Sequence, residues 1–346
     1  MLPRITAELP GINCTRHWDA AIACEEVLRR RPEGGDFWWL KVRSNAVSPH
    51  RVALAIARAA SIEIDHVAHA GPRERRAQCD HWFSVPKAEV EHPACFRNAG
   101  YQRRLKVLEV REGARPIGPR EVLAMQWQLR FAGGSADEGY DRAKAILDSL
   151  RRTGCPNYIL GQHSSAQLAK WGKLLAQGKD LPRRVREKGE SPKRMLLVYR
   201  DQLFNTWIAQ RIASDVFSAP LAGDVMEIGC NRPTWERDTM IVTDPESMRG
   251  RMDSWEAVPL GPLFGADMPE SQDDARACEL AACTEQGVKE QAFSRLAGAR
   301  RALRFRPAEL AVDIAGKDLT VQCQLPVSVR IAPLVEELLK PEGHLR

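Results

Sequence analysis

The stretch AGPRERRAQCDHW, residues 70–82, places one carboxylate, Glu74, among three arginines. The arginines are Arg73, Arg75 and Arg76, and the whole group lies in a short turn between two expected strands. Cations this close favour the ionised carboxylate, which keeps it available as a nucleophile or as an anionic stabiliser. A salt-bridge cluster on the surface is the alternative interpretation of the same residues.

The segments on either side of this turn alternate between strand and helix. Before it, DFWWLKVR at 36–43 is rich in strand formers, and the following segment predicts a helix over 49–60 with Pro at its first position. An extended stretch at 62–70 leads into the turn, and HWFSV at 81–85 predicts the strand that follows it. The turn therefore lies in a strand-rich region.

Two more strands and a helix continue this region. Residues 104–110 and 123–131 are typical of strands, and in the second strand apolar residues alternate with polar or small ones. Ser135, with Glu138 three residues later, makes a capping box. The pair predicts the start of a helix that ends near Arg152.

The pattern changes between about 169 and 306, where helices are predicted at 193–213 and 272–291 between loops rich in Pro and Gly. Strand periodicity returns at 319–325, and a final helix begins near residue 332. The economical interpretation is an α+β protein in which a mainly helical insertion interrupts a β-rich domain.

Arginine dominates the positive charge of the chain. The 346 residues carry a net charge of +6, and the 51 basic residues are 12 Lys and 39 Arg. The guanidinium of arginine makes paired hydrogen bonds to phosphate and stacks on bases, so this excess of arginine favours nucleic-acid binding. The densest run, RRVREKGESPKR at 183–194, is expected to be a solvated, mobile loop. Without a long apolar run or a signal-like first segment, a cytoplasmic protein is expected.

Neither a metal site nor a nucleotide cofactor is expected. The sequence contains no GxGxxG, P-loop, HExxH or GxSxG motif. His66 and His69 would lie on opposite faces of a strand, which argues against a metal between them. The nine cysteines are scattered without CxxC spacing, which favours reduced thiols over a disulfide framework.

The turn at 70–82 resembles the segment A-G-x-K-D-x-x-A-x-T-x-Q-W of the D-type tRNA pseudouridine synthases, the TruD family. The identical positions are Ala70, Gly71, Ala77 and Trp82. The resemblance makes Glu74 the counterpart of the family's catalytic aspartate nucleophile and Arg73 the counterpart of its lysine. The charges are kept, but the carboxylate of Glu74 lies one methylene further from the backbone.

Residues 156–165, PNYILGQHSS, are similar to a second family segment, N-Y-F-G-x-Q-R-F-G preceded by Pro. The resemblance implies that Asn157 helps to position the nucleophile. It also implies that Tyr158, Ile159 and His163 lie at the substrate. Ile159 stands where the family has Phe and so lacks a stacking surface worth about 1 to 3 kcal/mol per base.

Other family motifs lie near both ends of the chain and in the expected insertion. K-x-x-P-E-D-F aligns with 16–22, which makes Arg16 or Arg73 the charge partner of the nucleophile. Ile22 stands in place of the family's Phe, and Ile22 and Arg73 are expected at the substrate. YRDQLFNTWIAQR at 199–211 resembles the helix Y-x-S-x-L-F-N-x-x-L-x-x-R. L-P-x-G-S-Y-A-T becomes LPVSVRIA at 325–332. Further matches follow in order at 261–265, 268–269, 279, 298–304 and 307.

The fold implied by the resemblance is the pseudouridine synthase fold. This is a mixed, largely antiparallel sheet with flanking helices, expected at 1–168 and 308–346. An inserted, mainly helical TRUD domain is expected at 169–307.

The activity implied is the isomerisation of a uridine in tRNA to pseudouridine, at position 13 for the family, without metal or organic cofactor. The target base must first leave its stack. Arg75, Arg76, Lys193 and Arg194 are the expected contacts to the RNA backbone, and the protein is expected to act as a monomer. A catalytically silent TruD-like RNA-binding protein is the alternative, favoured by the altered site residues.

Overall fold

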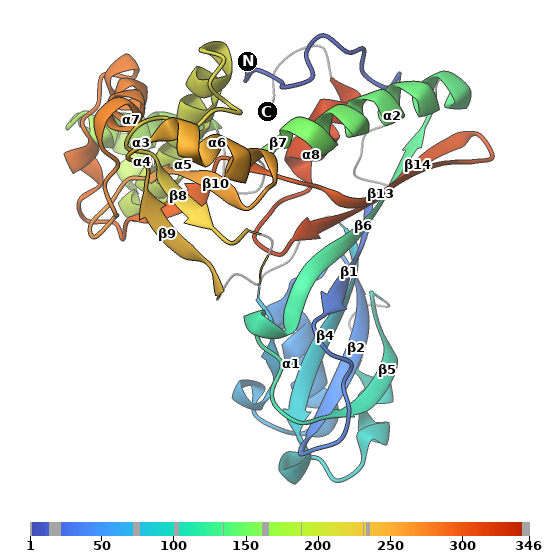
Figure 1. Cartoon of the computed structure of the whole chain (residues 1–346). Helices are drawn as coiled ribbons and strands as arrows, with labels where there is room; N and C mark the ends of the chain where they lie inside the picture. The colour runs from blue at the N-terminus through green and yellow to red at the C-terminus, as the bar shows by residue number, and fades with distance from the viewer. Residues whose placement is uncertain are drawn as a thin grey trace. The chain divides into compact units, whose positions relative to one another are not determined.

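The chain forms two compact units in the computed structural model (Figure 1). Unit 1 consists of residues 1–11, 145–306 and 330–346, and unit 2 consists of 12–144 and 307–329. The structure describes residues 2–13, 22–71, 77–99, 104–133, 135–160, 166–187, 189–230, 232 and 236–340. Each unit is thus assembled from segments that are distant in the sequence. The domain boundaries expected at 168/169 and 307/308 stay a prediction.

Unit 2 is built on an eight-stranded sheet with the order β13-β14-β6-β1-β4-β2-β5, in which β3 also pairs with β4. The strands are β1 (Ile22–Leu28), β2 (Phe37–Asn45), β3 (Ala68–His69), β4 (Gln78–Pro86), β5 (Leu105–Gly113), β6 (Val122–Ala132), β13 (Ala308–Ala315) and β14 (Asp318–Pro326). Strands β1 and β4 run parallel, whereas the other described pairs are antiparallel. The predicted α+β class with a mixed, largely antiparallel sheet is confirmed.

Helix α1 (Pro49–Ala60) covers one face of this sheet. Pro49 lies in its first turn, and Ser61 ends it in the left-handed conformation, where its N–H bonds back to the carbonyls of the last turn. Val52 and Ile56 are fully buried, as are Leu40 and Val42 of β2 in the same cluster. Burial of each such side chain contributes about 1.5 to 3 kcal/mol, so this contact holds the centre of unit 2 together.

Unit 1 combines helices with two small sheets. Its strands are β7 (Cys155–Pro156), β8 (Val225–Ile228), β9 (Asp238–Ile241), β10 (Ala257–Leu263), β11 (Ala299–Ala302) and β12 (Arg304–Phe305), with the orders β11-β10-β8-β9 and β12-β7. Its helices are α3 (Ala166–Ala176), α4 (Arg183–Glu187), α5 (Pro192–Ala213), α6 (Pro245–Asp253), α7 (Asp273–Glu285) and α8 (Ala332–Leu339). Helix α2 (Ala136–Thr153) crosses the sequence boundary between the units.

Two expectations for this region differ from the structure. The run at 183–194 was expected to be a loop, but it forms α4 and the first turn of α5. Arg183 pairs with Glu187 one turn later, and the Ser191 hydroxyl caps α5 by accepting from the Arg194 N–H. The four-stranded sheet was not predicted. Among the described residues, no helix is long and apolar enough to cross a bilayer.

Helix α5 carries the core of unit 1. Phe204, Trp207 and Ile208 are buried in one cluster, and α5 packs against α3, α7 and β10. Gly261 of β10 lies directly against the Trp207 ring, so a Cβ at that position would overlap the indole. The glycine of this family-like segment is therefore required by the close approach of β10 to α5.

A fully buried ion pair involves Arg211 in the last turn of α5. Arg211 donates to both carboxylate oxygens of Asp224, at 2.8 and 3.1 Å, and to the carbonyl oxygen of Ala219 at 2.8 Å. Its guanidinium also lies 5.4 Å from the centroid of the Trp207 ring. The charge is thus matched by an opposite charge and several acceptors, which is the condition for burying an arginine.

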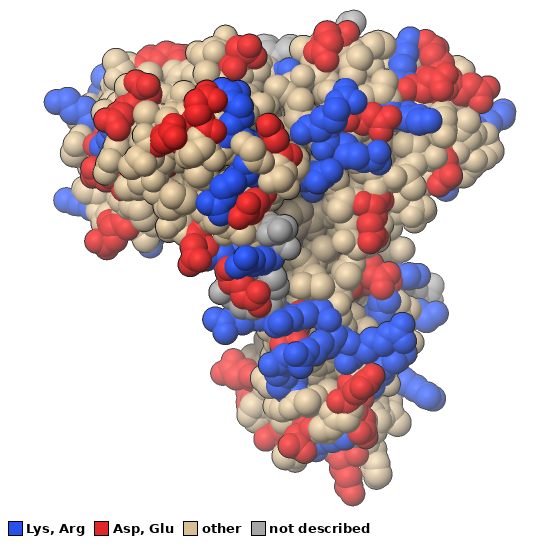
Figure 2. All heavy atoms as spheres, viewed as in Figure 1, with Lys and Arg blue, Asp and Glu red and all other residues tan. Residues whose placement is uncertain are grey.

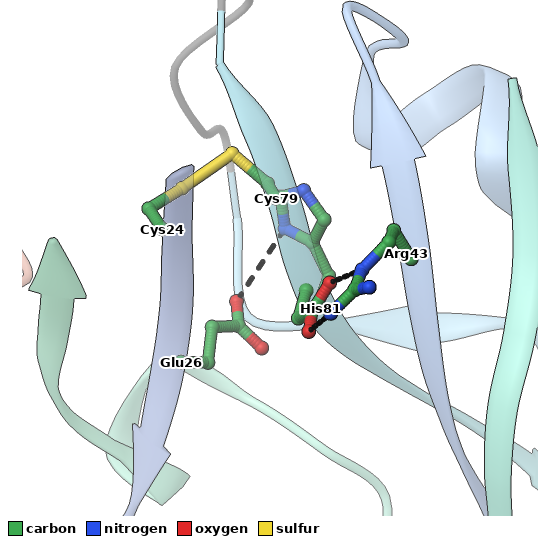
Figure 3. The surroundings of a disulfide bond; sticks show 6 residues. Cys24, Glu26, Arg43, Cys79 and His81 are labelled. Atoms are coloured by element: carbon green, nitrogen blue, oxygen red, sulfur yellow. Dashed lines mark hydrogen bonds and ion pairs between the residues drawn. A yellow bond between two sulfur atoms is a disulfide. The ribbon is translucent and has the colours of Figure 1, made fainter. Parts of the chain in front are cut away.

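The expectation of reduced thiols is wrong for Cys24 and Cys79, which form a disulfide between β1 and β4 (Figure 3). The two residues are direct partners in the parallel ladder, and their Cα atoms lie 4.7 Å apart. This separation lies within the range that a disulfide bridges. The pairing depends on strand register, which the spacing of cysteines in the sequence does not reveal.

Reduction of the Cys24–Cys79 disulfide is expected to lower the stability of unit 2. The bond links residues 55 positions apart, and closing a loop of that length contributes about 2 to 4 kcal/mol. Thermal unfolding with and without dithiothreitol measures the difference. Cys79→Ser should melt at the lower temperature under both conditions, whereas Cys95→Ser, which removes a free thiol of the same unit, should behave like the wild type. Equal melting of the wild type under both conditions would contradict the prediction.

Asp224→Ala is expected to destabilise unit 1 by about 3 to 5 kcal/mol, because it leaves the Arg211 charge buried without its partner. Urea unfolding followed by tryptophan fluorescence measures the change. The control is Glu187→Gln, which breaks an exposed pair with Arg183 and should cost less than about 1 kcal/mol. Similar losses in the two variants would refute the assignment of Arg211 as a buried structural charge.

Candidate active site

The predicted site residues divide into those that the structure describes and those that it does not. Asn157, Tyr158, Ile159, Lys193 and Arg194 are described. The expected nucleophile and several of its neighbours lie outside the described residues, as does one substrate contact; they are Glu74, Arg16, Arg73, Arg75, Arg76 and His163. Ile22 begins β1, but its side chain is not described.

Asn157 directly follows β7, and its side chain is held rigidly. It is 3 % exposed. The Arg301 guanidinium donates to Oδ1 at 2.6 Å, and Nδ2 donates to the Ala302 carbonyl at 2.9 Å. The Asn157 backbone N–H donates to the carbonyl of Leu303 at 2.9 Å. An amide nitrogen carries two N–H groups, so one remains beyond the bond to Ala302.

Tyr158 belongs to the core of unit 1. Its ring packs in the cluster of Phe204 and Trp207, and its hydroxyl donates to the carbonyl of Pro3 at 2.9 Å. Burial raises the pKa of the Tyr158 hydroxyl, so the group stays protonated and acts as a donor. The structure thus gives Tyr158 a packing role.

Ile159 is fixed through its backbone by Asn205 of α5. The Ile159 N–H donates to Asn205 Oδ1 at 2.8 Å, and Asn205 Nδ2 donates to the Ile159 carbonyl at 3.1 Å. The side-chain amide of Asn205 thereby makes the two hydrogen bonds to the Ile159 backbone that a neighbouring strand would make. Helix α5 and strand β11 therefore set the conformation of 157–159 from two sides.

The Arg301 guanidinium, which donates to Asn157, is itself influenced by other charges. The Arg301 guanidinium lies 5.8 Å from the centroid of the Phe204 ring. Burial lowers the pKa of Arg301 to about 10, while the Asp201 charge acts to raise it and Arg330 to lower it. Burial raises the pKa of the Asp201 carboxyl to about 6, against the opposing charges of Arg200 and Arg301. Both groups are ionised for the most part at neutral pH.

Motif comparison named Asn157 but missed Arg301, Asn205 and Asp201. A signal for all three was present, since Asp201 and Asn205 lie in the family-like helix segment 199–211 and Arg301 in GARRALR at 298–304. The sequence did not show that Arg301 binds Asn157 or that Asn205 binds the backbone of Ile159. That depends on the antiparallel pairing of β11 with β10 and on the packing of β10 against α5.

In unit 2, the two ends of the turn that contains Glu74 are described. Gly71 has a φ of 122°, which suits glycine, and its N–H donates to His69 Nδ1 at 3.1 Å. At the other end, Asp80 of β4 accepts two hydrogen bonds of 2.8 Å from Arg43 of β2. The hydrogen bond to the side chain of Asp80 raises the pKa of Arg43, so the guanidinium stays charged.

Glu26 of β1 completes the anchoring of β4 (Figure 3). The parallel ladder between the two strands ends at Glu25 and Asp80, and the Trp82 N–H beyond it donates to Glu26 Oε2 at 2.7 Å. His81 Nδ1 lies 3.9 Å from the other oxygen of Glu26, and both side chains are buried. The Glu26 carboxylate thus accepts the hydrogen bond from the Trp82 N–H that a strand carbonyl would accept if the ladder continued.

Lys193 and Arg194 are exposed in the first turn of α5. Arg194 lies 3.8 Å from Glu190, a separation at which an exposed pair contributes little. Both cations are therefore accessible to a negatively charged partner. In the part of the chain that the structure describes, no group of three or more His, Cys, Asp or Glu side chains could hold a metal ion.

A family model described as tRNA pseudouridine synthase D (TruD) matches residues 17–162 and 171–328. The tRNA pseudouridine synthase D of Anaeromyxobacter sp. (strain Fw109-5) is 28% identical over 356 residues, which covers 99% of this chain and 97% of the relative. The tRNA pseudouridine synthase D of a Thermus thermophilus strain is 26% identical over 350 residues, with 99% and 93% covered.

The fold has a counterpart among solved structures. A crystal structure of a TruD protein from Methanosarcina mazei superimposes with a TM-score of 0.73 at 14% sequence identity, covering 97% of this chain and 95% of the other. The likeness supports the fold, and the family match spans segments of both units. The chain belongs to the tRNA pseudouridine synthase D (TruD) family.

Proposed function

We propose that the protein is a tRNA pseudouridine synthase that isomerises a uridine of tRNA, at position 13 as in the family, with Glu74 as its nucleophile. The observation that carries this proposal is the match to the TruD model over residues 17–162 and 171–328. Full-length relatives named tRNA pseudouridine synthase D support it. The buried, doubly held Asn157 supports it further, because a rigid amide is suited to orienting a carboxylate.

The reaction needs a carboxylate and groups that orient it. The Glu74 carboxylate attacks the target nucleoside, the bond between ribose C1′ and uracil N1 breaks, and the uracil turns over within the site. The uracil C5 then forms a bond to C1′ and the bond to the Glu74 carboxylate breaks, which releases the free carboxylate, while C5 loses its proton and N1 gains one. In this proposal Arg16 or Arg73 keeps Glu74 ionised by its charge, and Asn157 is the orienting hydrogen-bond donor.

The longer side chain of Glu74 sets the geometric requirement. A displacement of about 1 Å at a reacting group costs on the order of 10²-fold in rate. The turn must therefore hold its backbone further from the nucleoside than an aspartate would need. The anchored Gly71 and Asp80 at its two ends provide rigid points from which such a position can be maintained.

Binding of tRNA is expected to depend on arginine and lysine at several places. The RNA-backbone contacts are Arg75, Arg76, Lys193 and Arg194. Figure 2 shows further basic side chains gathered on the visible surface of unit 2, over the region where Figure 1 labels β4, β2 and β5. These cations attract the phosphate backbone without reading its sequence. The protein is expected to act in the cytoplasm, where tRNA is processed, as a monomer without metal or cofactor.

Incubation with a tRNA that carries uridine at position 13, followed by chemical mapping of pseudouridine, tests the proposed activity. The wild type should form pseudouridine at that position. Glu74→Gln should form none, because the amide is not a nucleophile. Glu74→Asp keeps the carboxylate but withdraws it by about 1 Å, so it should still form pseudouridine at a rate lower on the order of 10²-fold. Tight tRNA binding without product at stoichiometric protein would instead establish a catalytically silent RNA-binding protein.

The double variant Lys193→Ala/Arg194→Ala is expected to weaken tRNA binding. Each lost phosphate contact should reduce the slope of log affinity against log salt by about 1. Filter binding at several salt concentrations measures both affinity and slope. Lys317→Ala is the matched control, since it removes an exposed cation of unit 2 and should leave the slope unchanged. An unchanged slope in the double variant would rule out this contact.

A further inference from the structure

The eight-stranded sheet of unit 2 has a short junction between β1 and β4. Strand β1 pairs with β6 along its whole length, and β2 does so with β4. Within the described residues, β1 and β4 themselves pair only at 23–25 with 78–80, which is the shortest ladder between neighbours in the order β13-β14-β6-β1-β4-β2-β5. The sheet therefore consists of two well-paired halves, β13-β14-β6-β1 and β4-β2-β5, which meet at three residue pairs.

Polar side chains supplement the ladder at this junction. Glu26 of β1 accepts the Trp82 N–H of β4 at 2.7 Å, and Lys41 of β2 forms an ion pair with Glu25 of β1. Glu25 is largely exposed, and an ion pair in such a position contributes little. The apolar cluster against α1 takes its strand residues from β2, β4 and β5, so this cluster stabilises one half of the sheet and does not join the two.

The Cys24–Cys79 disulfide is the covalent link across the junction (Figure 3). The neighbouring pair, Ala23 with Gln78, is the last pair of the ladder. The side chains of Cys24 and Cys79 are 5% and 1% exposed in the closed sheet. Because ladder ends open locally more readily than ladder centres, opening of one residue pair is enough to admit a small molecule to the two sulfurs.

The reduced form is compatible with the same fold. A free cysteine behaves as a small apolar side chain, so two buried thiols can remain in contact when the bond is broken. Cys79 also stands at the position of Thr in the family-like motif of 70–82, so the motif itself does not include this cysteine. In a cytoplasm, where the protein is expected to act, most thiols are kept reduced, and the disulfides that do form are usually redox-sensing or catalytic.

We propose that Cys24 and Cys79 form a reversible thiol–disulfide switch, which sets how firmly the two halves of the unit 2 sheet are joined. The reaction partner is a low-molecular-weight thiol and its disulfide. In the oxidised form the covalent bond holds β1 against β4. In the reduced form only the short ladder and the polar contacts hold them, and the junction opens more often. The inference concerns unit 2 alone and does not depend on the proposed function.

The reaction is an exchange between two disulfides. A thiolate of the small molecule attacks one sulfur of the pair, the Cys24–Cys79 bond breaks, and the other cysteine leaves as a thiolate. A second small thiol then attacks the mixed disulfide and releases the second cysteine. Two small thiols are thereby oxidised to one small disulfide, and the protons that they lose are available to the two cysteines. The reverse sequence restores the bond.

A redox titration of the native, full-length protein tests reversibility. Oxidised and reduced protein are incubated separately in glutathione buffers of varied ratio, free thiols are trapped with N-ethylmaleimide, and the peptides of Cys24 and Cys79 are quantified by mass spectrometry. The two starting states should reach the same oxidised fraction at each ratio, with a half-point inside the range of ratios used. Near-UV circular dichroism should show that both forms remain folded.

Hydrogen exchange measured by mass spectrometry tests where the switch acts. On reduction, peptides that cover 22–28 and 78–82 should exchange at least about tenfold faster, because a constraint on local opening is removed. Peptides that cover β14 and β10 should stay within about twofold, since β14 lies within one half of the sheet and β10 lies in unit 1. Cys79→Ser should exchange like the reduced wild type in every buffer. Cys95→Ser, which removes a free thiol of the same unit, should switch like the wild type.

Three outcomes would overturn the inference. The first is a bond that persists in excess reduced glutathione, which would make it a permanent structural disulfide. The second is a pair that stays reduced in excess oxidised glutathione. The third is faster exchange spread evenly over unit 2, which would mean that the bond stabilises the whole unit and not the junction. None of these readouts uses pseudouridine formation, so a failure of the proposed function would leave the result intact.

Discussion

The hydrogen bond from the Arg301 guanidinium to Asn157 Oδ1 joins three elements of unit 1. It connects β11 to the segment after β7, while the same guanidinium rests against Phe204 of α5. Because Asn157 also donates to Ala302, its amide is held from both ends by adjacent residues of one strand. Removal of the guanidinium would leave a buried amide oxygen unpaired and free the side chain to rotate.

In unit 2, a disulfide, a carboxylate and an ion pair fix strand β4 to its two neighbours. Strand β4, which follows the turn that contains Glu74, is tied to β1 by a disulfide and by Glu26, and to β2 by the Asp80–Arg43 pair. These contacts lie on both sides of β4 within one short stretch, from Cys79 to Trp82 with Asp80 between. A nucleophile that must act at a defined distance benefits from a rigid strand immediately beyond it.

Much of the fold could be predicted because its signals are local. Pro49 marked the start of α1, and the Ser135–Glu138 spacing marked the start of α2, where the Glu138 N–H does lie 3.4 Å from the Ser135 hydroxyl. The Cys24–Cys79 bond could not be predicted, since it arises from the register of two strands 55 residues apart. The hydrogen bond from Arg301 to Asn157 could not be predicted for the same reason. Family motifs named Asn157, but only tertiary packing shows which charges hold it.

The position of β14 in the sheet has a consequence for synthesis of the chain. Strand β6 pairs along one edge with β14, which is separated from it by residues 133–317. At a ribosomal rate of about 5 to 20 residues per second, β6 emerges roughly 10 to 40 s before its partner. During that time its edge is open to other chains, and such edges promote aggregation. Production of this protein should therefore benefit from conditions that protect nascent chains, such as low temperature or added chaperones.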